Sequence, residues 1–86
     1  MKKADLIRAF TKKHYIDPAR EKKDKVVSVR AGDIHHQMSL SQSLPAVCSA
    51  LGSTKFENLC NVKRKDIVGP ANGSSTTFVY EIMDSF

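Results

Sequence analysis

The 86-residue chain contains no tryptophan, only two cysteines and only four glycines. Cys48 and Cys60 form no CxxC pair, and with no secretory signal in front of them they are typical of buried thiols in a reduced intracellular protein. The glycines are scattered, so neither a GxGxxG nor a GK(S/T) phosphate loop is present. No apolar run approaches the roughly 20 residues that a membrane span needs. We therefore expect a cytoplasmic protein with both thiols free and no membrane association.

The length allows one domain over residues 1–86 with a modest core. A chain of this size buries roughly 60–65% of its unfolded surface, which leaves little room for a deep catalytic cleft. We expect no enzymatic activity and no cofactor.

Positive charge is concentrated in the first third of the sequence. Residues 1–30 carry ten Lys/Arg and four Asp/Glu, whereas residues 31–86 carry four and five, for a total of +5. A basic field on one part of a small domain favours polyanions: DNA, RNA or an acidic membrane surface. The same charge is equally compatible with a solvated surface that keeps the protein soluble.

The amino-terminal segment predicts a helix over residues 4–14. Leu6, Ile7 and Phe10 fall on one stripe of a 3.6-residue period. Pro18 is expected to end or interrupt this helix, because proline disfavours helical backbone at the residue before it. A second short helix over residues 18–23 is possible, with the preceding aspartate as its N-cap.

A β-branched run then predicts a strand over residues 26–29. Asp33 is a good N-cap for a short helix over residues 34–38. The polar residues 39–43 predict a turn, and Ser43 can cap the helix that follows.

That next helix has the clearest pattern in the chain. Apolar residues recur at i, i+3, i+4 and i+7 from Leu44, and Pro45 falls in the first turn, where its missing N–H costs nothing. The period slips at Gly52, so the helix either kinks or restarts, and Thr54 with Glu57 fits a capping box. We expect these residues to be buried: Leu44, Val47, Leu51, Phe56 and Leu59.

Residues 62–68 and 75–83 predict two strands of a β-hairpin, joined by a Gly/Pro/Asn-Gly loop over residues 69–74. The basic run Lys63–Lys65 begins the first strand, where alternation places Arg64 on the face opposite the two lysines. These charges either protect an edge strand from aggregation or clamp phosphate.

Histidine and cysteine do not form a recognisable site. His35, His36, Cys48 and Cys60 lack the close paired spacing of structural zinc ligands. A Cys48–His35 nucleophile pair is disfavoured because Cys48 lies on a buried stripe. We therefore expect no metal and no catalytic residues, with His36 exposed and His35 partly packed.

The order helix, strand, short helix, turn, helix, hairpin resembles the winged helix-turn-helix family. Residues 32–51 carry the resemblance, with Ile34 and Met38 inside the first helix, Leu40 in the turn, and an apolar second helix. The resemblance spans roughly residues 6–82. It implies an α+β fold, with about three helices on a small antiparallel sheet and the hairpin as a wing. It also implies that the second helix enters a DNA major groove.

The second helix of this motif, which contacts the bases in the family, departs from the usual family pattern because its candidate contacts are uncharged apart from Lys55. Either the DNA is bound by basic residues of the first helix, of residues 20–25 and of the hairpin, or the domain is a winged-helix adaptor for a protein partner. RNA binding is a third possibility, and the oligomeric state is left open. The expected nucleic-acid contacts are Gln42, Ser43, Ser49, Ser53, Lys55, Lys63, Arg64, Lys65 and Asn72.

Overall fold

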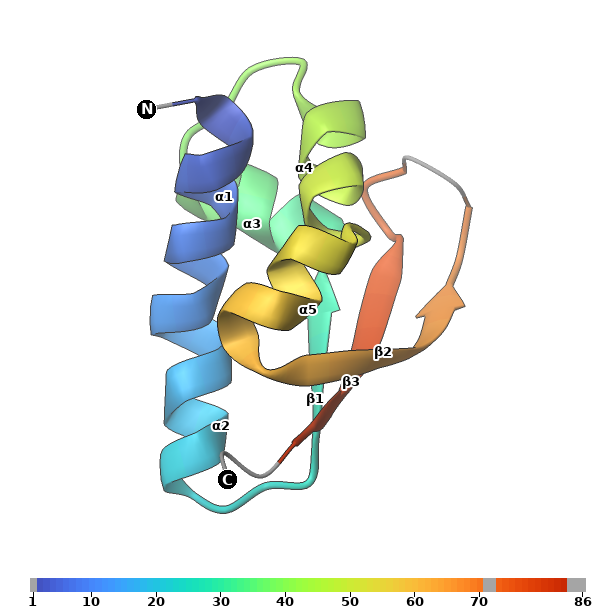
Figure 1. Cartoon of the computed structure of the whole chain (residues 1–86). Coiled ribbons are helices and arrows are strands. Elements are labelled where there is room, and N and C mark those ends of the chain that lie inside the picture. Colours follow the sequence, from blue (N-terminus) through green and yellow to red (C-terminus); the bar gives the residue numbers. More distant parts are fainter. Residues whose placement is uncertain (1, 71–72, 84–86) are drawn as a thin grey trace.

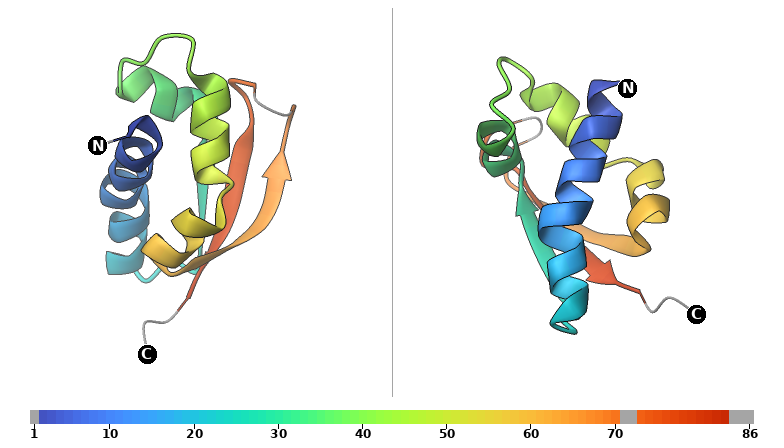
Figure 2. Two further views of the ribbon diagram at one scale, coloured as in Figure 1. Left: turned by 45° about the horizontal axis from the view of Figure 1, so that its top comes forward. Right: turned by 90° about the vertical axis from the view of Figure 1, so that its left-hand side faces the viewer.

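The computed structural model describes residues 2–70 and 73–83, which form a layer of helices on one face of a three-stranded antiparallel sheet (Figures 1 and 2). In chain order the elements are α1 (Lys3–Thr11), the π-helical turn η1 (Lys12–Ile16), α2 (Asp17–Glu21), β1 (Val26–Arg30), α3 (Ala31–Gln37), α4 (Leu44–Leu51), α5 (Thr54–Cys60), β2 (Val62–Val68) and β3 (Thr77–Ile82). The sheet has the order β1-β3-β2. The chain is therefore a small α+β fold, as expected. No helix in the described residues is long and apolar enough to cross a membrane.

The first helix continues past the predicted interruption. α1, η1 and α2 form one rod, because the backbone takes up a π-helical turn just before Pro18 (Figure 1). Asp17 is helical, with φ −62° and ψ −44°, so it does not cap a separate second helix as the sequence had allowed. Pro18 lies in the first turn of α2, where its missing N–H is tolerated. The helix thus changes from α to π just before the proline, and the chain continues in the same direction.

β1 confirms the predicted strand and extends it to Arg30, but α3 begins three residues earlier than predicted. The N–H groups of Ala31 and Gly32 donate to the carbonyl oxygens of Thr76 (2.8 Å) and Ser74 (2.9 Å). These bonds from a distant part of the chain satisfy the first turn of α3. Asp33 therefore lies inside the helix rather than at its N-cap, and pairs with Arg30 at 3.3 Å.

The helix restarts at the predicted slip. α4 ends at Leu51, and the N-cap of α5 is Ser53, whose hydroxyl accepts a bond from Phe56 N (3.2 Å); the capping box expected from Thr54 is absent. Phe56 and Cys60, one turn apart, face the core, whereas Leu59 is 49% exposed, so the predicted burial of Leu59 is wrong.

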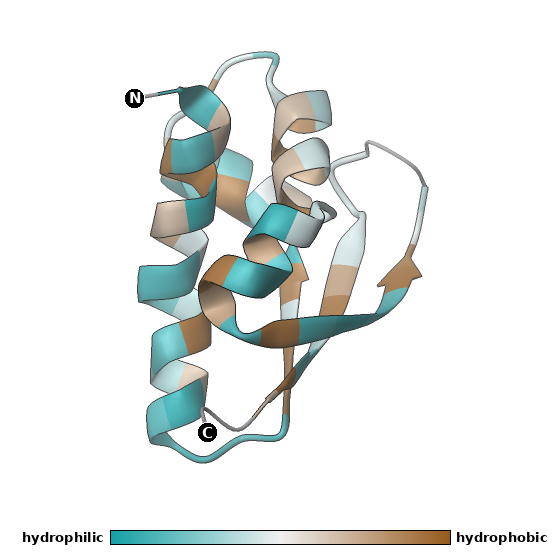
Figure 3. Ribbon diagram, viewed as in Figure 1, coloured by the Kyte–Doolittle hydropathy of each residue, from teal (hydrophilic) through white to brown (hydrophobic). Residues whose placement is uncertain are grey.

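The core lies between the rod, α3 to α5 and the inner face of the sheet. Val47, Leu51 and Phe56 are fully buried as predicted, while Leu44 is only partly buried. The larger side chains around them are Ile7, Ile16, Val29, Ile34, Phe78 and Tyr80. The outward side of the rod is mostly hydrophilic (Figure 3). Both cysteines are buried thiols, which confirms the expectation that they form no disulfide.

Candidate nucleic-acid interface

Helix α4 presents a narrow uncharged stripe to solvent. Pro45 and Ser49 are exposed one turn apart, whereas Val47, Ala50 and Leu51 are buried against α1, α3 and the core. The hairpin stands beside this helix on the side away from the rod (Figure 2). Ser49 is thus placed where the sequence expected a contact, on the outer surface of α4.

At the start of α4, Ser43 is held inside the structure and binds a lysine of α1. Its hydroxyl donates to Ser41 O (2.9 Å) and accepts from Lys3 Nζ (3.0 Å), and the residue is only 3% exposed. Ser43 therefore positions the Lys3 ammonium at this end of α4 and offers little surface of its own. Gln42, the residue before it, is exposed in a left-handed conformation with φ 49°.

At the other end of α4, a second cation of α1 is fixed. Arg8 Nε donates to Ser53 Oγ (3.2 Å) and its Nη1 to Asp5 Oδ1 (2.9 Å), while Lys55 Nζ lies 3.6 Å from the same carboxylate oxygen. Ser53 is half-buried and also donates to Ala50 O (2.7 Å). The predicted contact Ser53 thus positions Arg8, and Lys55 is exposed beside it.

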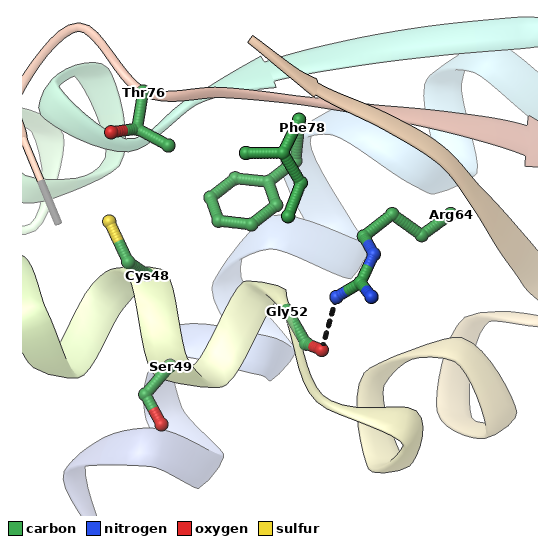
Figure 4. Close-up of a pocket in the computed structure, with 7 residues that line it drawn as sticks. Cys48, Ser49, Gly52, Arg64, Thr76 and Phe78 are labelled. Atoms are coloured by element: carbon green, nitrogen blue, oxygen red, sulfur yellow. Dashed lines mark hydrogen bonds between the residues drawn. The ribbon is translucent and has the colours of Figure 1, made fainter. Parts of the chain in front are cut away.

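Arg64 reaches α4 from the hairpin. Its Nη1 donates to Gly52 O (2.7 Å), directly after the last residue of the helix, where a positive charge also complements the helix dipole. The side chain borders an open pocket of about 380 Å³ between α4 and the hairpin (Figure 4). The pocket is lined by Cys48, Ser49, Gly52, Arg64, Ile67, Thr76 and Phe78.

Lys63 and Lys65 lie on the other face of the sheet. Lys63 is opposite Glu81 in the β2–β3 register, and Lys65 occupies a β-bulge with its Nζ 3.9 Å from the Glu81 carboxylate. The structure therefore separates both lysines from α4, although it places Arg64 on the opposite face from them as predicted.

The outer edge of β2 is protected as well as charged. Arg64 N donates to the Glu57 carboxylate (2.9 Å), and Ile67 N donates to Asp66 Oδ1 (2.8 Å). Side-chain oxygens thus occupy N–H groups that another strand would use.

The basic residues of the first third divide between the two ends of the rod. Lys3 and Arg8 lie beside α4, whereas Lys22, Lys23 and Lys25 are exposed beyond the far end of α2 (Figure 1). Other cations serve the fold. Lys12 pairs with Asp17 (3.2 Å), and Arg20 donates to the carbonyl oxygens of Cys60 and Asn61 (both 2.9 Å).

The sequence predicted positive charge in residues 1–30 but did not identify Lys3 and Arg8 as neighbours of α4. Both fall outside the stripe of Leu6, Ile7 and Phe10, and this position does not show which element lies beside them. The remaining predicted contact, Asn72, lies outside the described residues.

The histidines and cysteines take the packing roles expected of them. His36 is exposed, and His35 is half-buried with Nε2 accepting from Ser43 N (3.1 Å). Burial raises the pKa of Cys60 to about 11, which keeps it a neutral thiol at physiological pH. Within residues 2–70 and 73–83, no three His, Cys, Asp or Glu side chains gather as metal ligands do.

Comparisons with protein-family models, with curated proteins and with solved structures gave no match to this chain.

Proposed function

We propose that this chain is a winged-helix-like domain that binds double-stranded DNA through α4 and the neighbouring hairpin. One observation carries the proposal. The uncharged exposed stripe of α4 is bordered by Lys3 and Arg8 from α1 on one side and by Arg64 from β2 on the other. Phosphate contacts supply most of the affinity in such an interface, while small polar side chains on the central helix reach base edges.

The topology supports the same proposal. α3 and α4 are joined by a short turn, and the hairpin that follows lies beside α4 in a sheet of order β1-β3-β2. A helix about 10–12 Å across fits a major groove about 12 Å wide. With Pro45 and Ser49 exposed on its surface, α4 can approach the bases closely, and the exposed cations Lys3, Lys55 and Arg64 around it then face the phosphate backbones.

A protein-binding adaptor is the alternative function, and the pocket favours it. Ile67 is 43% exposed at its wall, next to the buried ring of Phe78. Such a pocket can take an apolar side chain of a partner protein.

Two charge-matched variants distinguish binding at α4 from unspecific attraction. K2A/K3A/K55A removes Lys3, its exposed chain neighbour Lys2, and Lys55. K22A/K23A/K25A removes three charges at the far end of the rod. Fluorescence anisotropy with a mixed-sequence duplex over a salt series should show at least tenfold weaker binding for the first variant. Its log–log salt slope should also be smaller by up to about 2.7, at about 0.9 for each phosphate that is no longer neutralised. The second variant should stay within threefold of the parent.

Ser49→Ala tests base readout separately. It should change the preference among duplex sequences and leave the salt slope unchanged, because a hydroxyl releases no counterions. Equal weakening by the two triple variants would show that binding depends on the net charge of the protein and not on the position of α4. A folded sample that bound no duplex more tightly than millimolar at low salt would end the DNA proposal in favour of the adaptor.

A further inference from the structure

The turn between α3 and α4 has an unfavourable backbone that its contacts must hold in place. Ser39 and Gln42 both have left-handed conformations, with φ 55° and 49°, which residues with a Cβ rarely adopt. Ser39 N and Leu40 N close the end of α3 on the carbonyl oxygens of His36 and His35, both at 3.0 Å. The connection from the turn into α4 depends on a different bond.

That bond joins a backbone amide to an imidazole. Ser43 N, at the N-cap of α4, donates to His35 Nε2 at 3.1 Å, and Ser43 is only 3% exposed. A buried N–H without an acceptor is strongly disfavoured. An imidazole nitrogen accepts only when it carries no proton, so His35 is the neutral tautomer with its hydrogen on Nδ1.

The charged groups around this bond do not favour an imidazolium. Lys3 brings its ammonium from α1 to Ser43 Oγ (3.0 Å), and α4 has no charged residue. On the side of β1, Arg30 is paired with Asp33 of α3 (3.3 Å). His36, the remaining titratable group of α3 besides Asp33 and His35, is exposed.

We propose that His35 is a proton-sensitive latch that fixes the start of α4. Neutral His35 holds Ser43 N and keeps the turn closed. Protonation places a second N–H against the Ser43 amide, which breaks the bond and loosens the turn and the first residues of α4. A fall in pH that protonates the ring therefore opens the latch. Its effect on DNA affinity rests on the proposed function, whereas the latch itself does not.

NMR of the free protein tests the latch. We expect the Ser43 amide resonance to titrate with the same midpoint as the His35 ring between pH 8 and pH 5. Protection of the first α4 amides from hydrogen exchange, corrected for intrinsic rates, should fall about tenfold over that range. H35Q, whose amide oxygen can accept at the Nε2 position without titrating, should abolish both responses, and the matched control H36Q should retain them.

Three results would overturn the latch: a Ser43 amide that does not follow His35, a response that survives in H35Q, or ring ¹⁵N shifts of the unaltered protein at pH 8 that place the proton on Nε2. The last measurement decides the question even if H35Q fails to fold. A duplex titration at pH 7.5 and 5.5 then tests the coupling, with weaker binding expected at pH 5.5 for H36Q but not for H35Q. Absent DNA binding with an intact NMR response would refute the proposed function and leave the latch standing.

Discussion

The hydroxyl of Tyr80 donates a 2.6 Å hydrogen bond to the carbonyl oxygen of Leu51, the last residue of α4. Both residues are fully buried, so this bond ties the central strand β3 to the proposed reading helix from inside the core. Burial raises the pKa of Tyr80 far above its ordinary value of 10, which keeps the phenol protonated as a donor. The spacing between α4 and the hairpin therefore depends on a buried polar contact as well as on packing.

Replacing Tyr80 by Phe should reduce the free energy of unfolding by about 1–3 kcal/mol, because it leaves the Leu51 carbonyl buried without this donor. Tyr15→Phe is the matched control. Its hydroxyl accepts from Gln37 Nε2 (2.8 Å) at the surface, and its loss should cost less than about 0.5 kcal/mol. Urea denaturation measures both variants. Equal losses would contradict a special role for the buried bond.

Leu51 and Leu59 give a second matched pair. Leu51→Ala should cost about 2–5 kcal/mol, because its side chain is fully buried, whereas Leu59→Ala should stay within about 0.5 kcal/mol at 49% exposure. Chemical denaturation of the two variants checks this difference. A loss below half a kcal/mol for Leu51→Ala would mean that α4 does not pack as described.

The periodicity of the sequence was enough to predict α4, β1 and the hairpin, because each pattern is local and repeats with the period of its element. The error at Leu59 has a local cause too. The stripe of Phe56, Leu59 and Cys60 spans positions i, i+3 and i+4, and only two of the three face the core. Periodicity marks the apolar side of a short helix but not where its edge meets solvent.

The surroundings of α4 could not be predicted in this way. Lys3 meets Ser43 and Arg8 meets Ser53 across 40 and 45 residues of chain. These contacts follow from how α1 crosses α4. The periodicity of a helix shows which of its faces is buried, but not which other element packs against that face. The early start of α3 has a similar origin, because its first N–H groups are satisfied by the hairpin.

Stability should fall as the pH rises above about 9. The pKa of Cys60 is raised from 9.0 to about 11 in the folded protein, so between these values the unfolded state loses the proton first and is favoured. The contribution present at neutral pH is lost across this interval, at about 1.4 kcal/mol per pKa unit. Tyr80 acts in the same direction, because its pKa is also raised.

Cys60→Ala isolates the cysteine contribution. The variant should be less stable at pH 8 because of the lost packing, but its free energy of unfolding should decline less steeply between pH 8.5 and pH 10.5 than that of the parent. The titrating lysines are common to both proteins and cancel in the comparison, whereas Tyr80, whose pKa is raised by burial and by Cys60, changes the slope in the same direction. Identical pH slopes would show that Cys60 ionises as easily in the folded state as in the unfolded chain.

Gly32 and Gly52 differ in what a methyl group would meet, which makes them a test of how the hairpin is docked. A Cβ on Gly32 would overlap the carbonyl oxygen of Ser74, the same atom that accepts the Gly32 N–H at 2.9 Å. Backbone cannot give way there without breaking the contact that starts α3. Gly32→Ala should therefore cost about 1–3 kcal/mol, as overpacking of a rigid site does.

A Cβ on Gly52 would instead lie 3.2 Å from Arg64 Nη1, the end of a flexible side chain, and 3.2 Å from the carbonyl oxygen of Cys48, so no contact is as close as the one at Gly32. Gly52→Ala should therefore cost less than about 1 kcal/mol, because the guanidinium can shift by a few tenths of an ångström and alanine restricts the unfolded chain. Thermal unfolding ranks the two variants, and hydrogen exchange at Ala31 and Gly32 locates the damage. Those two amides should lose protection in Gly32→Ala and keep it in Gly52→Ala. The reverse order would mean that Arg64, and not the loop before β3, fixes the hairpin against the helices.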